Sequence, residues 1–150
     1  MVINEMKLQI PSKSANESFA RIAVSSFFAQ LDPTIDEISD IKTAVSEAVT
    51  NSMRYSNCKS FNIAIIVMNK MVRCTISDDG IGCDEIVDGM GLSGMRQRIR
   101  LVGGTIDFET HPGFKVSMLL PLDQWEGFVY IIIIGVILSY GENKSYNCRW

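Results

Sequence analysis

The chain has 150 residues, the size of one ordinary domain, and its content of 47% hydrophobic and 21% charged residues is typical of a folded protein. Its 14 basic and 17 acidic side chains give a formal net charge of −3, so it lacks the basic field that nucleic-acid binding needs. Four cysteines without a CxxC pair and a single histidine argue against a zinc site and favour reduced thiols in a cytoplasmic protein. The first residues carry no apolar segment behind basic ones, so no secretory signal is expected.

The first third of the chain predicts a short strand and two helices. Residues 6–10 alternate apolar and polar side chains up to Pro11, which favours a strand. Capping boxes at Ser14–Glu17 and Thr34–Glu37 predict the starts of the two helices. The first helix is predicted to face the core with Phe19, Ala23, Phe27 and Leu31. The second is predicted to face it with Ile38, Ile41, Val45, Ala48 and Ser52.

The remainder of the pattern predicts two hairpins separated by a helix. Alternation over residues 61–67 and 72–77 indicates a first hairpin, and residues 105–109 and 115–120 indicate a second. A helix is predicted to begin after Gly89. The resulting order is strand, two helices, two strands, helix, two strands. This order predicts an α+β fold of two layers, with the helices on one face of a mixed, mostly antiparallel sheet.

The second helix carries a polar face beside its buried stripe. Glu47, Asn51 and Arg54 follow one another at i, i+4 and i+7, so they line one side of the helix. Asn51 offers an oxygen ligand to Mg²⁺, Glu47 is placed to act as a general base, and Arg54 can bind a phosphate oxygen. Taken alone, a solvated surface is the simpler interpretation of this triplet.

Two glycine-rich turns strengthen the functional interpretation. Asp78-Asp79-Gly80-Ile81-Gly82 leaves a predicted strand, and residues 89–95 open a predicted helix. Glycine lets the backbone approach a ligand closely, and a helix N-terminus favours anions. Asp78 can accept a hydrogen bond from an adenine amino group. The other residues assigned to the nucleotide are Gly80, Gly82, Gly89, Gly91, Leu92, Gly94 and Met95.

The ordered set of motifs resembles the GHKL superfamily of ATP-binding domains over nearly all of residues 6–122. The set comprises EAVTN, ISDDGIGCDEI and GMGLSGMRQRIRLVGGTIDFET. The resemblance implies a two-layer α/β sandwich of the Bergerat type that binds Mg·ATP between the second helix and the two glycine motifs. It also implies that Asn51 holds magnesium, that Asp78 recognises adenine and that Glu47 is the base.

Two branches of the superfamily are represented. Residues 4–51, with NESFAR, AQLDPTIDEI and IKTAVSEAVTN, resemble the anti-sigma-F factor, a serine protein kinase of spore-forming bacteria. Residues 53–122 resemble the catalytic domain of sensor histidine kinases of the NarL-associated type. The first resemblance implies a homodimer that sequesters a sigma factor and phosphorylates a serine of an anti-anti-sigma partner, with Arg21 on the sigma-contacting surface.

Two alternatives to the serine kinase remain open. The chain can be part of a sensor histidine kinase. It would then be the catalytic half alone, because its only histidine, His111, lies in a predicted turn and is no phosphoacceptor. It can also be a non-catalytic nucleotide-binding module. Two departures from the family pattern bear on this choice: the segment 83–88 between the glycine motifs is short, and Tyr55 stands where histidine is usual.

The domain is predicted to span residues 1–122, with residues 123–150 as a C-terminal tail. The tail contains an apolar block, Phe128–Leu138, that has no counterpart in either branch. The block is shorter than the roughly 20 residues of a membrane-spanning helix, so a membrane anchor is the least favoured interpretation. A strand or helix packed on the domain is the favoured one, ahead of an extension unrelated to the fold.

Overall fold

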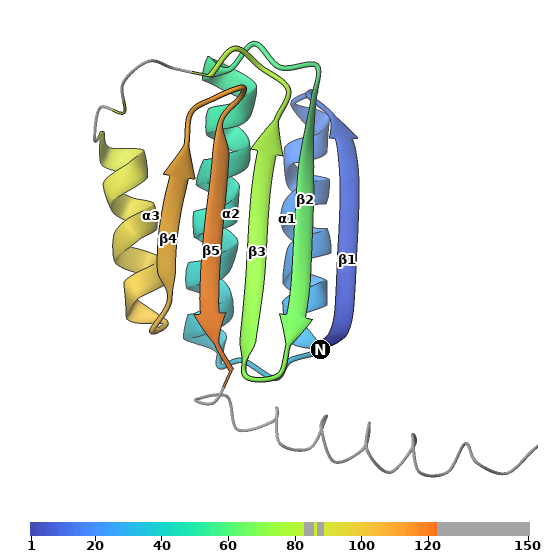
Figure 1. The fold of residues 1–150 in the computed structure, drawn as a ribbon, viewed down its shortest axis with the longest axis vertical. Helices are drawn as coiled ribbons and strands as arrows, with labels where there is room; N and C mark the ends of the chain where they lie inside the picture. Colours follow the sequence, from blue (N-terminus) through green and yellow to red (C-terminus); the bar gives the residue numbers. More distant parts are fainter. Residues whose placement is uncertain (83–85, 87–88, 123–150) are drawn as a thin grey trace, which may run out of the picture.

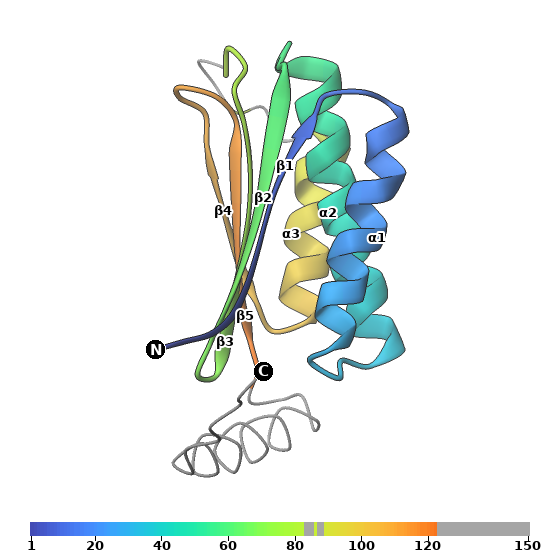
Figure 2. The same ribbon diagram turned by 90° about the vertical axis from the view of Figure 1, so that its right-hand side faces the viewer.

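The structure is a computed structural model, and it describes residues 1–82, 86 and 89–122. Figures 1 and 2 show one sheet whose strands stand side by side, with the helices packed against one face and the other face open. This arrangement confirms the predicted α+β architecture and the predicted order of elements. The elements are β1 (Val2–Pro11), α1 (Ala15–Ala29), α2 (Ile35–Tyr55), β2 (Ser60–Met68), β3 (Met71–Asp78), α3 (Met90–Leu101), β4 (Thr105–Glu109) and β5 (Lys115–Pro121).

The sheet has the strand order β1-β2-β3-β5-β4, and each pairing between neighbours is antiparallel. The described strands therefore form an antiparallel sheet rather than the mixed one that was expected. The cause is the path of the chain after β3. It crosses through α3 to β4 at the edge of the sheet, and β5 then returns between β4 and β3, antiparallel to both.

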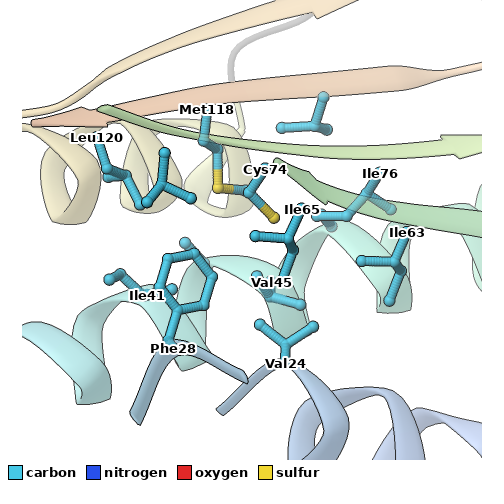
Figure 3. Packing of buried hydrophobic residues seen from close by; sticks show 14 of the residues in the cluster. Val24, Phe28, Ile41, Val45, Ile63, Ile65, Cys74, Ile76, Met118 and Leu120 are labelled. Carbon is cyan, nitrogen blue, oxygen red and sulfur yellow. The ribbon is translucent and has the colours of Figure 1, made fainter. Parts of the chain in front are cut away.

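The core lies between the helices and the covered face of the sheet (Figure 3). Strand residues that point toward the helices alternate with residues that point away, which is the pattern of a sheet with one buried face. The thiol of Cys74 lies within this core, and burial raises its pKa to about 12. Core residues labelled in Figure 3 are Val24, Phe28, Ile41, Val45, Ile63, Ile65, Cys74, Ile76, Met118 and Leu120.

The buried face of α1 is rotated from the predicted one. Phe19 is 55% exposed, so its assignment to the core is wrong. Phe27 and Leu31 are buried as predicted, and Ala23 is half-buried. The buried residues of α1 are Ala20, Val24, Phe27 and Phe28.

Of the two predicted capping boxes, one forms. Thr34 Oγ1 accepts from the backbone N–H of Glu37 at 3.3 Å, and Glu37 Oε2 accepts from the backbone N–H of Thr34 at 2.8 Å. The box at Ser14 does not form, because Ser14 itself has helical dihedral angles and its side chain makes no cap hydrogen bond. Glu17, its predicted partner, instead forms an ion pair with Arg21 at 3.4 Å.

Helix α3 is fixed to its neighbours at its C-terminal half. Arg98 Nη1 donates to Asp40 Oδ1 of α2 at 2.7 Å. The guanidinium of Arg96 lies over the ring of Phe108 on β4, 4.7 Å from its centre. These contacts set the position of α3 beside α2, and thereby the position of its N-terminal glycines. Among the described helices, none combines the length and the apolar character that crossing a bilayer requires.

Candidate functional site

The polar face of α2 forms one wall of the candidate site. The stripe of α2 that includes Ile41, Val45 and Ala48 is buried against the sheet, while Glu47 is exposed and Asn51 half-buried. Arg54, one turn further along the helix, is exposed. The structure therefore places these three side chains away from the core, on a single helix whose start is fixed by the capping box at Thr34.

The N-terminal turn of α3 lies against this wall. A Cβ atom built on Gly91 would lie 3.4 Å from Glu47 Oε2 and 3.5 Å from Asn51 Nδ2. Gly91 therefore lies directly beside the carboxylate and the amide, and a methyl group there would be in ordinary contact with both. Gly89 occupies the N-cap position with extended dihedral angles, so no side chain there competes for the first N–H groups of the helix.

The remaining members of the second glycine motif divide into two groups. Leu92 packs against the core and Met95 is fully buried, so they hold the helix in place. Cβ atoms on Gly89 or Gly94 would meet nothing within 4 Å among the described residues. Gly89 and Gly94 therefore have space beside them, whereas Leu92 and Met95 pack the first turns of α3 against the core.

Asp78 is the last residue of β3, and its two carboxylate oxygens have different surroundings. Oδ1 accepts from the backbone N–H of Gly80 at 3.0 Å and from that of Phe114 at 3.2 Å. Oδ2 is buried and has no hydrogen-bond partner among the described residues. Leaving a buried acceptor unpaired is costly, so such an atom marks a place where a donor from a ligand fits.

The first glycine motif packs closely against two backbone segments, at Ser56 and at Thr110. A Cβ on Gly80 would overlap the carbonyl oxygen of Ser56 at the end of α2, and one on Gly82 would overlap that of Thr110. Gly82 also has φ of +68°, a conformation that side chains rarely adopt. The N–H of Ile81 donates to the same Ser56 oxygen at 3.0 Å. These glycines shape the site by allowing the loop to pack closely.

Asp79 has a structural task that its sequence did not indicate. Its Oδ1 accepts from the backbone N–H groups of Lys59 at 2.8 Å and Ser60 at 3.0 Å. The hydrogen bond from the backbone of Ser60 is the main cause that lowers the pKa of Asp79. Asp79 thus links the end of β3 to the start of β2, and leaves Asp78 as the carboxylate that faces the site.

The family model for the histidine kinase-, DNA gyrase B-, and HSP90-like ATPases matches residues 36–124. The chain belongs to this ATPase family. The match covers α2, α3 and β3, which ends at Asp78, and so includes each wall of the candidate site.

Relatives of this ATPase domain include anti-sigma F factors. The one from Clostridium botulinum strain Eklund 17B is 52% identical over 90 residues, which is 57% of this chain and 63% of that protein. The one from Geobacillus kaustophilus is 48% identical over 87 residues, which is 55% of this chain and 60% of that protein. The chain thus spans less than two-thirds of the length of these relatives.

A solved structure with the same fold is the histidine kinase domain of a blue-light activated histidine kinase from Erythrobacter litoralis. It superposes with a TM-score of 0.55 at 19% identity, over 80% of this chain and 65% of that one. At this identity the likeness supports the fold of the ATPase domain alone.

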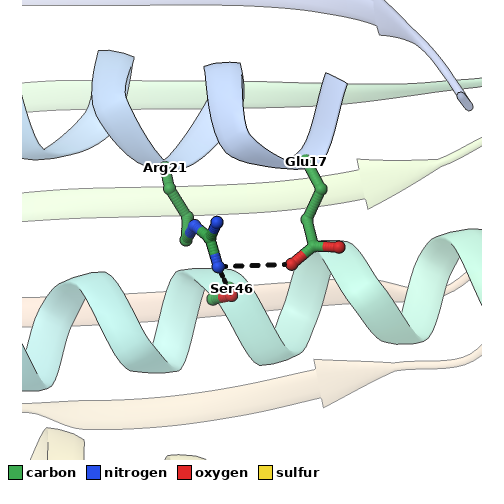
Figure 4. Close-up of polar contacts among 3 residues, drawn as sticks. All are labelled: Glu17, Arg21 and Ser46. Atoms are coloured by element: carbon green, nitrogen blue, oxygen red, sulfur yellow. Dashed lines mark hydrogen bonds and ion pairs between the residues drawn. The ribbon is translucent and has the colours of Figure 1, made fainter. Parts of the chain in front are cut away.

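Arg21, the predicted contact for a sigma factor, lies between α1 and α2 of the ATPase domain. Its Nη1 atom is 3.4 Å from Glu17 Oε1 and 3.4 Å from Ser46 Oγ (Figure 4). The side chain is partly exposed, and Ser46 directly precedes Glu47 on α2. Its assignment to a partner surface stays a prediction.

Two predicted features of this ATPase domain lie outside the described residues. They are the short segment 83–88, of which only residue 86 is described, and the tail 123–150. Among the described residues there is no cluster of three or more histidine, cysteine, aspartate or glutamate side chains that would hold a metal ion. Magnesium held by Asn51 together with nucleotide phosphates would need no such cluster.

Proposed function

We propose that this chain is an ATP-binding protein kinase domain of the anti-sigma-factor type. In this proposal it binds Mg·ATP, sequesters a sigma factor and phosphorylates a serine of an anti-anti-sigma partner. The observation that carries the proposal is the 52% identity to an anti-sigma F factor within a chain of the ATPase family. The geometry of the site supports the nucleotide part of it.

Adenine recognition is assigned to Asp78. Its Oδ2 atom is a buried acceptor without a partner among the described residues, and the amino group of adenine is a donor that can satisfy it. Guanine presents an oxygen at the corresponding position and would leave two acceptors facing each other. The site is therefore expected to prefer ATP over GTP.

Phosphate and magnesium binding is assigned to the facing walls of α2 and α3. Asn51 supplies an oxygen to Mg²⁺, and the glycines at the start of α3 expose backbone N–H groups to the phosphates. Arg54 contributes a positive charge on the same helix face. Magnesium, when bound, offsets the negative charge of the phosphate oxygens.

Glu47 is assigned the role of general base. In the proposed reaction its carboxylate takes the proton of the serine hydroxyl while the hydroxyl oxygen bonds to the γ-phosphorus of ATP. The bond from that phosphorus to the bridging oxygen breaks, and ADP leaves with the bridging oxygen. The exposure of Glu47 is consistent with an acceptor that arrives from a second protein.

The sigma factor and the anti-anti-sigma protein are proposed partners, and a homodimer is the proposed assembly. Arg21 is the proposed contact for the sigma factor. Its position beside Ser46 would connect the partner surface on α1 with the α2 helix that bears Glu47.

The test is phosphoryl transfer from γ-labelled ATP by the full chain. A serine-bearing anti-anti-sigma protein and a histidine-bearing helical hairpin are supplied in parallel, and acid-stable label on serine is expected. Glu47→Gln is expected to lower the rate by about 10²-fold or more while ATP still binds. The Gln97→Ala variant, exposed on α3 beyond the site, serves as the control with unchanged transfer.

The second candidate is the catalytic half of a sensor histidine kinase, which the resemblance of residues 53–122 to that catalytic domain favours. Acid-labile label on the supplied histidine, with none on serine, would select it. Nucleotide binding without transfer to either acceptor would leave the non-catalytic module.

A further inference from the structure

The face of the sheet opposite the helices is not covered by them (Figure 2), and the strand residues that point to this face are apolar at one end. Strand residues at this end alternate in direction, and the inward-pointing Ile65, Val72 and Met118 are fully buried under the helices. Their neighbours along the strands therefore point to the open face. We call these neighbours the outer patch: Ile66, Met68, Met71, Leu119 and Pro121.

The register of the strands joins the outer patch into one surface. Met71 pairs with Met68 on one side and with Pro121 on the other. One step along the strands, Arg73 lies between Ile66 and Leu119. Met71 is 37% exposed and the other apolar members are half-buried, so the patch is open to contact in the described part of the chain.

The other end of the same face is polar. A single row across the strands there consists, in order, of Gln9, Asn62, Ser77, Lys115 and Glu109. The apolar residues of this face are thus gathered at one end, and a contiguous exposed apolar patch is typical of a contact surface.

The described chain ends at the edge of the outer patch. Pro121 is the last residue of β5, and the N–H of Leu122 donates to the carbonyl oxygen of Lys70 in the β2–β3 turn at 2.8 Å. The sequence continues with Asp123, Gln124, Trp125, Glu126 and Gly127, and then with the apolar block Phe128–Leu138.

Length and charge both allow the apolar block to reach the patch. Six residues from Leu122 to Phe128 span up to about 20 Å when extended, and neighbouring strands are about 4.8 Å apart. Asp123 and Glu126 precede the block, and Arg73 is an exposed cation within the patch. The surface thus offers a cation to the acidic connection and apolar side chains to the apolar block.

We propose that the segment Phe128–Leu138 of this chain covers the outer patch of its own sheet. The competing occupants are a second copy of the chain and a membrane that takes up the segment. The block is about half as long as the roughly 20 residues that a spanning helix needs, and the patch lies within reach of the same chain, so coverage within one chain is the simpler arrangement.

The two tryptophans of the sequence are Trp125 and Trp150. Both belong to residues 123–150, so tryptophan fluorescence reports on that part of the chain alone. The test uses the full chain with Trp150→Phe, which leaves Trp125 as the single emitter. Coverage predicts a blue-shifted emission, protection from acrylamide and no dependence of either on protein concentration.

Leu119→Asp in this background places a charge in the patch, and should shift the emission to the red and raise the acrylamide quenching constant severalfold. Asn62→Asp, on the same face at the polar end, should leave both unchanged. Circular dichroism identifies any variant that fails to fold, and Met71→Asp, at an exposed position of the patch, then replaces Leu119→Asp.

Three results would overturn the proposal. Equal quenching of Trp125 in the parent and in Leu119→Asp would show that the segment does not cover the patch. Protection that grows with protein concentration would assign the patch to a second copy. A blue shift that arises only on adding phosphatidylcholine and phosphatidylglycerol vesicles would assign the segment to a membrane.

Discussion

Asp78 satisfies one carboxylate oxygen inside the protein and leaves the other without a partner among the described residues. The backbone N–H groups of Gly80 and Phe114 hold Oδ1, so the carboxylate cannot rotate without losing two hydrogen bonds. Oδ2 is thereby fixed in a buried position and remains unpaired among the described residues. A preset acceptor of this kind discriminates between ligands by their donors, because the wrong ligand leaves it unsatisfied.

Asp78→Asn tests this assignment. The substitution presents a donor or a neutral acceptor where a charged acceptor stood, and a hydrogen bond to a charged group contributes about 1.5–3 kcal/mol. We expect ATP affinity to fall about tenfold or more and the preference for ATP over GTP to disappear, as measured by isothermal titration. Asp79→Asn is the matched control, because its carboxylate binds Lys59 and Ser60 instead, and it should keep the preference. Equal binding of ATP and GTP by the unmodified chain would contradict the role of Asp78.

Gly91 offers a second test at the residue scale. It lies beside Glu47 and Asn51, and an added Cβ would contact their polar atoms at 3.4 Å and 3.5 Å and occupy space between the two walls of the proposed site. Gly91→Ala should therefore weaken ATP binding, while the free energy of unfolding stays the same or rises by less than about 1 kcal/mol, since alanine favours a helix more than glycine does. Titration and urea unfolding on the same samples separate the two effects. A variant with unchanged affinity would remove Gly91 from the site.

At the scale of elements, α2 connects the core with the site. One side of it is buried under the sheet, and the other presents Glu47, Asn51 and Arg54. Its start is fixed by the reciprocal hydrogen bonds of Thr34 and Glu37. The spacing of polar residues along α2 can therefore serve a ligand only because the helix is held at a fixed rotation and depth.

The two predicted capping boxes give a matched pair of substitutions. Thr34→Ala removes a formed cap and should lower the free energy of unfolding by about 1 kcal/mol. Ser14 makes no cap hydrogen bond in α1, so Ser14→Ala should change the free energy of unfolding by a few tenths of that loss at most. Urea unfolding of both variants measures the difference. Equal losses would contradict the assignment of caps.

The limits of prediction from sequence are clearest in these elements. Periodicity was sufficient for the order of helices and strands and for the buried stripe of α2. It was wrong for Phe19 and Ser14, because the rotation of α1 and the conformation at its start depend on contacts with the rest of the fold. The antiparallel placement of β5 between β3 and β4 is likewise a consequence of the crossover, which no local pattern encodes.

The same limit applies to the site. The order of the motifs was sufficient to group Glu47, Asn51, Asp78 and the glycines into one candidate site. It did not predict that Asp79 accepts from Lys59 while Asp78 accepts from Phe114, because these partners come from other parts of the chain. The close packing of Gly80 against Ser56 is equally invisible in the sequence, because the two residues meet only when α2 and the sheet are assembled.

At the scale of the whole molecule, the fold separates two surfaces. The helix side carries the proposed nucleotide site between α2, α3 and the end of β3, and the open side of the sheet carries the outer patch at the end where β5 finishes. A change in the outer patch is therefore expected to leave the nucleotide site in place. The mutual independence of the two surfaces makes the proposals about them separately testable.

The most direct test of the central claim is isothermal titration of the full chain with Mg·ATP, comparing the unmodified protein with Asn51→Ala. Asn51 is half-buried on α2 and outside the core, so the variant should unfold at the same urea concentration. We expect saturable binding by the unmodified chain and none by Asn51→Ala under the same conditions. Unchanged affinity in a folded Asn51→Ala variant would contradict the assignment of Mg·ATP to this site.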